Sequence, residues 1–260
     1  MVIRDWSSDV CSSDLEHQKS FSNIINFLKP GDVLVLNDTK VLNARLVGEN
    51  KDTKGKIDAL IIKSNSNEAT AMIQSGRHPK IGDLYNFLGS NSEIYVAKLV
   101  GKNDLGWILN FDNVYVSYVM EKIGLPPLPP YIKRKEKFAC KNEDSERYQT
   151  VYAKNSGSIA APTAGLHFTE KLLETIREKN IEIVYVTLHV GTATFLPVKS
   201  ENILEHKMNS EIYQISEESA LKINLAIKEG RRVIATGTTS CRTLESAGRT
   251  GYIEPGSGQT

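Results

Sequence analysis

The feature that most constrains the fold is a set of short β-rich runs between two stretches in which helices and strands alternate. Between residues 49 and 144, turns of Gly, Asn and Ser separate the runs Lys56–Lys63, Ala69–Gln74, Glu93–Leu99 and Trp107–Phe111. This spacing predicts a small antiparallel barrel or sandwich. The flanking alternation favours an α/β layer. We therefore expect a larger α/β domain with a mixed sheet, residues 16–48 and 145–260, interrupted by an inserted small antiparallel β-barrel domain, residues 49–144.

The flanking stretches contain two strands that are apolar on both faces, Asp32–Leu36 and Ile181–Leu188. Near-continuous apolar runs of this length are typical of strands covered on both sides in a parallel or mixed sheet. Thr169 and Ser216 are suited to cap the helices that begin after them, and Gly230 is suited to end the second of these helices.

The composition indicates a globular protein of the cytoplasm. Hydrophobic residues make up 40% and charged residues 24%, and the net charge of +1 neither demands nor excludes a nucleic-acid partner. No apolar run approaches the ~20 residues that a membrane helix needs. The three cysteines are scattered without metal-ligand spacing. That distribution fits a reducing cytosol without disulfides or zinc.

The two ends of the sequence depart from this pattern. Residues 1–15, MVIRDWSSDVCSSDL, contain Ser-Ser-Asp twice and show no helix or strand periodicity. We interpret them as a disordered or non-native tail, which resembles translated adaptor or vector sequence. The chain stops at TGYIEPGSGQT, a loop-like stretch directly after a helix. We expect a C-terminally truncated fragment that is weakly stable or inactive.

One candidate site is the stretch VIATGTTSCRTLES, in which an apolar strand runs into small polar residues and then into a helix. Thr238, Thr239 and Arg242 would combine hydroxyls, free backbone N–H groups and positive charge, which suits an anion. Neither the P-loop nor the G-x-G-x-x-G pattern is present. The alternative is a tight strand–helix turn with Thr239 or Ser240 as N-cap.

Two histidines lie in turns rich in Gly and Thr. SIAAPTAGLHFTE presents Thr163 and His167 before a helix. His189 ends a buried strand in TLHVGTATFLPV, where Gly191 lets the backbone approach a ligand closely. An imidazole at the carboxyl end of a strand is suited to general acid or base catalysis near neutral pH. A structural role is the alternative for both histidines.

The densest basic run consists of Lys133, Arg134, Lys135 and Lys137. Such a run is either a solvated loop or a contact for a phosphate backbone. Glu205 and His206 are adjacent further along the chain, but no H-E-x-x-H spacing occurs. Polar recognition of a substrate is therefore favoured over a metal site.

Taken together, the motifs resemble those of the S-adenosylmethionine:tRNA ribosyltransferase-isomerase family of queuosine biosynthesis. The resemblance covers about residues 16–248, is dense after Glu146 and is weaker through the insert. The motifs that carry it occur in this order: GDVLVLNDTKVLNARL, LPPYI, ERYQTVYA, SIAAPTAGLHFTE, VTLHVGTATFLPV, EHKMNSE and VIATGTTSCRTLESAG. The architecture of that family, a larger α/β domain with an inserted β-barrel, agrees with the pattern above.

The resemblance implies a specific reaction. The family transfers the ribosyl part of S-adenosylmethionine to 7-aminomethyl-7-deazaguanine at the tRNA wobble position. It then rearranges the ribose to give epoxyqueuosine, with release of adenine and methionine. S-adenosylmethionine is thus a consumed substrate, and no cofactor and no metal are expected. The implied partners are tRNA carrying the modified base and S-adenosylmethionine, and the protein is expected to be a monomer without membrane contact.

The resemblance also implies roles for the candidate residues. His189 would serve one proton transfer and His167 the other, unless the amine of the substrate acts as the base. Thr238, Thr239 and Arg242 would hold the methionine carboxylate or a tRNA phosphate. The basic run would contact tRNA. The remaining substrate-binding residues would be Asn37, Asp38, Thr163, Gly191, Thr192, Glu205 and His206.

The sequence departs from the family pattern at several points. Gly191-Thr192-Ala193-Thr194 stands where Gly-Ala-Gly-Thr is usual, and Asn209 stands where histidine is frequent. The family's segment before Glu16 and its part after the Gly-rich loop are missing. Two other functions stay open, a non-catalytic tRNA-binding module and a conventional S-adenosylmethionine methyltransferase. The lack of an early strand, Gly-rich loop and helix counts against the methyltransferase.

Overall fold

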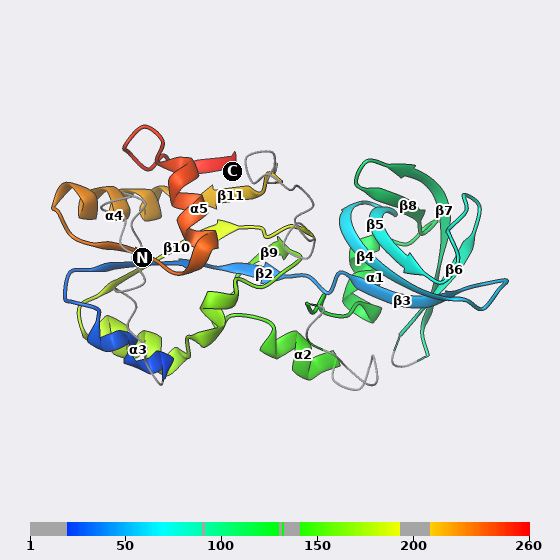
Figure 1. The fold of residues 1–260 in the computed structure, drawn as a ribbon, viewed down its shortest axis with the longest axis horizontal. Helices are drawn as coiled ribbons and strands as arrows, with labels where there is room; N and C mark the ends of the chain where they lie inside the picture. The colour runs from blue at the N-terminus through cyan, green and yellow to red at the C-terminus, as the bar shows by residue number, and fades with distance from the viewer. Residues whose placement is uncertain (1–19, 90–91, 130–131, 133–140, 193–208) are drawn as a thin grey trace, which may run out of the picture. The chain divides into compact units, whose positions relative to one another are not determined.

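The computed structural model describes residues 20–89, 92–129, 132, 141–192 and 209–260. The described residues form two compact units, drawn in Figure 1. Residues 20–40, 149–190 and 209–260 form an α/β unit, and residues 41–148 with 191–192 are assigned to a barrel unit. The predicted start of the insert at residue 49 falls inside a barrel strand, because strand pairing in the barrel already begins at Arg45. The predicted tail, residues 1–15, lies outside the described residues.

The α/β unit contains a five-stranded mixed sheet in the order β12-β1-β10-β11-β13. Its strands are β1 (Val33–Asn37), β10 (Glu182–Leu188), β11 (Ile212–Ile215), β12 (Val233–Ala235) and β13 (Gly256–Gln259). β12, β1 and β10 run parallel, whereas β11 and β13 extend one edge in antiparallel pairings. The helices are α3 (Glu170–Glu178), α4 (Glu217–Lys228) and α5 (Gly237–Ala247), with 3-10 helices at Phe21–Asn26 and Thr163–His167.

The sheet is covered on both faces because successive residues of a strand point to opposite sides. Val33 and Val35 of β1 lie in one apolar core with α4 and α5. Leu34 and Leu36 lie in a second core with α3. Figure 1 accordingly shows α4 and α5 on one side of β1 and β10, and α3 on the other. The predicted α/β layer with a mixed sheet is confirmed.

Side chains cap two of the helices as predicted. Thr169 Oγ1 accepts a hydrogen bond from Leu172 N at 3.2 Å, and Ser216 Oγ accepts one from Ser219 N at 3.1 Å. Each bond satisfies an N–H group that has no partner within its helix. Gly230 follows α4 with a φ of 69°, the left-handed conformation that favours glycine after a helix.

A buried carboxylate ties the start of β1 to the start of β12. Asp32 is 4% exposed and accepts hydrogen bonds from Arg232 Nε at 2.8 Å, from Arg232 Nη2, and from the Lys29 N–H at 2.6 Å. Burial by itself raises the pKa of Asp32, but the bonds from Arg232 and Lys29 outweigh it. The pKa of Asp32 is therefore lower than its ordinary value.

We expect Asp32→Asn to lower the free energy of unfolding by about 2 kcal/mol at neutral pH, because charge-assisted hydrogen bonds are lost. A carboxylate whose pKa is depressed by folding contributes stability above its unfolded-state pKa, and the contribution disappears as pH falls through the folded-state value. The difference between wild type and variant should therefore shrink below about pH 4. Urea unfolding of both proteins at neutral and acid pH measures it. If wild type and variant differ by the same free energy of unfolding at neutral and at acid pH, the stabilising role of the ionised Asp32 carboxylate is wrong.

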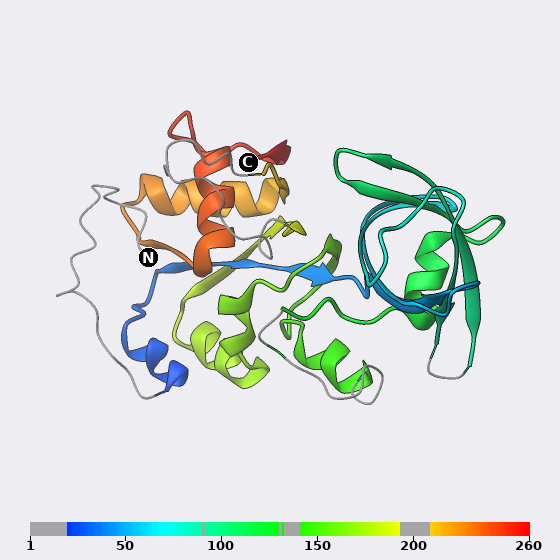
Figure 2. The same cartoon turned by 45° about the vertical axis from the view of Figure 1, so that its right-hand side comes forward.

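The barrel unit is a closed antiparallel barrel with the strand order β3-β4-β5-β8-β7-β6. Its strands are β3 (Arg45–Asn50), β4 (Lys56–Asn65), β5 (Glu68–Ser75), β6 (Leu84–Leu88), β7 (Ile94–Asn103) and β8 (Gly106–Asn110), and its helices are α1 (Val116–Ile123) and α2 (Lys141–Arg147). The buried face of α1 joins the apolar interior of the barrel. Figure 2 shows α1 with the barrel seen nearly along its axis. The predicted small antiparallel barrel is confirmed.

Two strands of the barrel, β3 and β6, were not predicted from the sequence. They pair with each other and alternate between more and less buried residues, but Gly48, Asn50 and Asn86 give them the composition of turns. A Cβ at Gly48 would lie 2.1 Å from the backbone oxygen of Asn86. Glycine at this position therefore allows two strands to approach closely and does not mark a turn.

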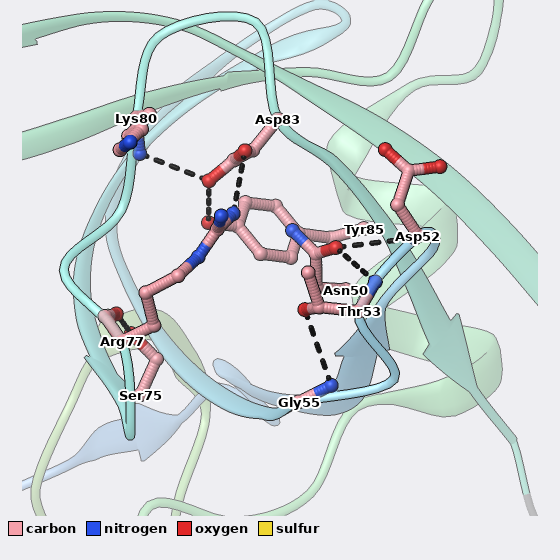
Figure 3. Close-up of polar contacts among 9 residues, drawn as sticks. All are labelled: Asn50, Asp52, Thr53, Gly55, Ser75, Arg77, Lys80, Asp83 and Tyr85. Carbon is pink, nitrogen blue, oxygen red and sulfur yellow. Dashed lines mark hydrogen bonds and ion pairs between the residues drawn. The ribbon is translucent and has the colours of Figure 1, made fainter.

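A polar cluster around Asp83 fixes the loop before β6 (Figure 3). The Asp83 carboxylate accepts hydrogen bonds from the Lys80 N–H at 2.9 Å and from Arg77 Nη2 at 2.8 Å. It also accepts one from the Tyr85 hydroxyl at 3.1 Å. Burial, and then the charge of Asp83, raise the pKa of Tyr85 to about 12, so the hydroxyl stays protonated and donates at neutral pH. These interactions join residues of the loop to one another and to Tyr85 of β6, which indicates a structural role.

Candidate active site

The candidate active site lies where the carboxyl ends of β1 and β10 meet. The two strands are parallel neighbours, with Asn37 opposite Val186. Carboxyl ends of adjacent parallel strands commonly carry ligand groups. The chain continues from β1 into β2 (Thr39–Val41), which forms a two-stranded sheet with β9 (Asn155–Ser158). The polar residues of the site therefore come from β1, β2, β9 and β10 or directly follow these strands.

His189 follows the last residue of β10 and is half-buried. Its Nδ1 lies 2.9 Å from Thr39 Oγ1, and its backbone N–H donates to Ile212 O at 2.9 Å. Burial lowers the pKa of His189, and the negative charge of Asp38 opposes this shift only in part. The imidazole is therefore neutral at neutral pH, the form that can accept a proton from a substrate.

Gly157 of β9 lies against the ring of His189. Its φ is 154°, and a Cβ at this position would lie 2.7 Å from Cε1 and 2.8 Å from Nδ1 of the imidazole. Both distances are shorter than real Cβ contacts. The ring can keep this orientation only if residue 157 has no side chain.

Asp38 is the buried carboxylate of the site, with 7% of its surface exposed. Its Oδ1 accepts a hydrogen bond from Thr187 Oγ1 at 2.6 Å. Asn155 Nδ2 lies 3.2 Å from Oδ1 and 3.0 Å from Oδ2 of the same carboxylate, and donates as well to Thr187 Oγ1 at 2.9 Å. The carboxylate is thus held by a hydroxyl and an amide, which are both neutral groups.

Asn37 is 2% exposed and is bonded to the backbone of the neighbouring strand. Its Nδ2 donates to Leu188 O at 3.1 Å, and its Oδ1 accepts from Leu188 N at 3.0 Å and from Thr39 N at 3.1 Å. The amide thereby extends the pairing of β1 with β10 to the residue that precedes His189. This geometry favours a positioning role over the substrate contact expected from the sequence.

A cavity of about 480 Å³ opens beside β10 in the α/β unit. It exists because β11 pairs with β10 only at the last two residues of β10, which leaves the preceding strand edge uncovered. The first turns of α4 form one wall. His189 is not among the lining residues. The opposite wall includes the Asp38 cluster and two aromatic rings: Asp38, Asn155, Thr187, Tyr152 and Tyr185.

Thr163 and His167 lie in the 3-10 helix before α3, and both are exposed. The ring of His167 stacks on Phe21, with 5.0 Å between ring centroids. A Cβ at Gly237, the first residue of α5, would lie 2.7 Å from the Cβ of Ala164. The structure thus brings the turn that carries Thr163 and His167 against the start of α5. Within the described part of the chain, the two candidate histidines share no contact.

The start of α5 presents two of the predicted anion-binding residues. Thr238 is exposed and Thr239 is half-buried in the first turn of the helix. The alternative assignment of Thr239 or Ser240 as N-cap is wrong, because α5 already begins at Gly237. The glycine has a φ of 74°, which is the conformation the tight turn requires.

Arg242 is engaged in an ion pair inside the α/β unit. Its Nη1 lies 2.8 Å from Glu211 Oε2, and its Nη2 donates to Asn209 O at 2.7 Å. The guanidinium therefore links α5 to the start of β11. An anionic substrate group would have to compete with Glu211 for this side chain.

Other predicted residues are not described or lie at the edge of a gap. Gly191 and Thr192 are half-buried and precede the undescribed residues 193–208. Among the residues that the structure places, no group of three or more His, Cys, Asp or Glu could hold a metal ion. None of the described helices is long and apolar enough to cross a membrane. The predicted residues outside the described ranges are Lys133, Arg134, Lys135, Lys137, Glu205 and His206.

Three residues of the site were not singled out from the sequence: Asn155, Gly157 and Thr187. Thr39 belongs to the run Asn37-Asp38-Thr39, whose place after an apolar strand indicates ligand groups. The three residues lie more than a hundred positions further along the chain than Thr39, and only the fold brings them to the end of β1.

The comparisons with known proteins give a consistent match. The family model described as queuosine biosynthesis protein matches residues 7–260. A protein of Clostridioides difficile is 46% identical over 91% of this chain and 67% of its own length. A protein of Caldanaerobacter subterraneus is 48% identical over 92% of this chain and 69% of its own length. Both are named S-adenosylmethionine:tRNA ribosyltransferase-isomerase.

A solved structure is also similar. The crystal structure of S-adenosylmethionine tRNA ribosyltransferase from Thermotoga maritima has 27% sequence identity and a TM-score of 0.36. The match covers 92% of this chain and 64% of the Thermotoga chain. The present chain is therefore shorter than these relatives, and it spans less than two thirds of the solved one.

Proposed function

Because the chain belongs to the queuosine biosynthesis protein family, we propose that it transfers the ribosyl group of S-adenosylmethionine to tRNA and isomerises it. The acceptor in this proposal is 7-aminomethyl-7-deazaguanine at the wobble position, and the products are epoxyqueuosine-tRNA, adenine and methionine. S-adenosylmethionine is consumed as a substrate, and the reaction needs no metal and no further cofactor. The protein acts as a monomer in the cytosol, where it meets tRNA.

The observation that carries the proposal is the neutral, half-buried imidazole of His189 at the carboxyl end of β10, hydrogen-bonded to Thr39. The sulfonium of S-adenosylmethionine makes the neighbouring ribose C5′ protons acidic, so the reaction needs a base near that carbon. A histidine whose pKa is lowered by burial is unprotonated at neutral pH and can take that proton. The departing adenine needs a proton in turn, and His167 is the proposed donor.

Release of adenine from S-adenosylmethionine tests the proposal, and measurable turnover together with cooperative unfolding would refute the expectation of a weakly stable or inactive fragment. The assay uses tRNA carrying 7-aminomethyl-7-deazaguanine at the wobble position, with the same tRNA carrying guanine as the matched control. We expect adenine and methionine in equal amounts, and only with the modified tRNA. S-adenosylhomocysteine as the product would indicate a methyltransferase instead. Salt-dependent tRNA binding without any consumption of S-adenosylmethionine would indicate a binding module.

A further inference from the structure

Asp38 differs from the other buried carboxylates of the α/β unit. Asp32, at the opposite end of the same strand, is paired with Arg232, and Glu211 is paired with Arg242. Asp38 is 7% exposed, and its hydrogen-bond donors are the neutral side chains of Thr187 and Asn155. Within the described residues, no cation forms an ion pair with it.

A buried carboxylate without a cation is unfavourable, because burial removes the hydration of the charge. Asp38 nevertheless lines a cavity of about 480 Å³. Lys154 and Lys222 line the same cavity, of which Lys222 is paired with Glu218 and Glu182, and a molecule of ordinary metabolite size can enter it. A cationic group bound in this cavity would supply the missing counter-charge.

The surroundings of Asp38 favour one kind of cation. Three hydrogen bonds fill three of the roughly four acceptor sites of the carboxylate, which leaves about one for the three N–H donors of an ammonium group. The wall that carries Asp38 also includes the rings of Tyr152 and Tyr185, whose centroids are 5.6 Å apart. A cation without N–H donors can interact with a carboxylate by charge and with aromatic rings through their faces. A sulfonium has these properties.

We propose that the cavity beside β10 binds S-adenosylmethionine and that Asp38 is the counter-charge of its sulfonium. This inference rests on the proposed function, since that function supplies the sulfonium ligand. The assignment makes Asp38 a specificity-determining residue. It would distinguish S-adenosylmethionine from the uncharged thioether S-adenosylhomocysteine, which lacks one methyl group and the positive charge.

Equilibrium binding by calorimetry tests the assignment, with S-adenosylmethionine and S-adenosylhomocysteine as the two probes. We expect wild type to bind the sulfonium roughly tenfold more tightly than the thioether, which corresponds to one partly screened charge pair. In Asp38→Asn the ratio should fall to about one, with the affinity for the thioether little changed. The asparagine has nearly the same size, but it replaces one acceptor oxygen with an NH2 donor beside the Asn155 amide, so thermal unfolding of the variant is measured as well, to separate loss of the charge from loss of stability.

Glu218→Gln is the matched control. Glu218 is also a carboxylate at this cavity, but its side chain is 76% exposed and is paired with Lys222 at 2.8 Å. Its replacement should leave the preference for the sulfonium intact. Wild type that binds both probes equally would overturn the role of Asp38 while leaving the proposed function in place. Wild type that binds neither probe would count against the proposed function itself.

Discussion

His189→Ala is expected to reduce adenine release about 10²- to 10⁴-fold, the usual contribution of a general acid or base. The imidazole is half-buried, its pKa is lowered by burial, and its Nδ1 lies 2.9 Å from Thr39 Oγ1. Removal of the ring leaves the site without its neutral nitrogen base. The affinity for tRNA should be unchanged, because a proton-transfer group contributes to the reaction and not to binding of the nucleic acid. Single-turnover adenine release and tRNA binding measure the two effects separately.

His78→Ala is the matched control for this experiment. His78 is an exposed histidine of the barrel unit, and its ring lies edge-on to Trp107 with 5.5 Å between centroids. The control variant should release adenine at the wild-type rate. Unchanged turnover in His189→Ala would remove His189 from the mechanism. Loss of tRNA binding in that variant would show that the ring supports the binding surface instead.

Gly157→Ala is expected to reduce adenine release about 100-fold, although residue 157 has no side chain that could react. A Cβ at this position would lie 2.7 to 2.9 Å from three atoms of the His189 ring, so the ring must move. Displacement of a catalytic group by about 1 Å can cost about this factor. The hydrogen bond to Thr39 should be lost together with the activity. NMR of the labelled histidine reports the position of the ring, and adenine release reports its effect.

Gly256→Ala separates this clash from backbone strain. Gly256 also has a positive φ, 122°, but a Cβ there would meet nothing within 4 Å. Its replacement strains the backbone in a similar way without touching the histidine. The control should be destabilised yet active. Equal activity in the two variants would contradict the proposed role of Gly157.

Much of the fold could be predicted from local patterns in the sequence. The apolar run of β1 is buried along its whole length. The caps at Thr169 and Ser216 form as expected. The strands β3 and β6 could not be predicted, because Gly48 and Asn86 resemble turn residues and only their mutual pairing explains them. Pairing between distant strands is a tertiary effect that local propensity does not encode.

The candidate site was predictable only in part. The position of His189 after a buried strand, and of Asp38 after its parallel neighbour, indicated where ligand groups gather. The ion pair of Arg242 with Glu211 could not be foreseen, because the fold alone brings α5 close to the residue that precedes β11. The contact between Gly157 and His189 depends on the pairing of β2 with β9. The family was identified from the order of its motifs, and the match to the family model confirms it.

S-adenosylmethionine labelled in its ribose carbons shows whether the ribose is transferred to tRNA. The chain is incubated with this substrate and with tRNA that carries 7-aminomethyl-7-deazaguanine at the wobble position. We expect one labelled ribosyl unit on the tRNA for each adenine released, with methionine unlabelled. Label that stays in a free nucleoside while the tRNA gains only a methyl group, or nothing, would show that the ribose is not transferred.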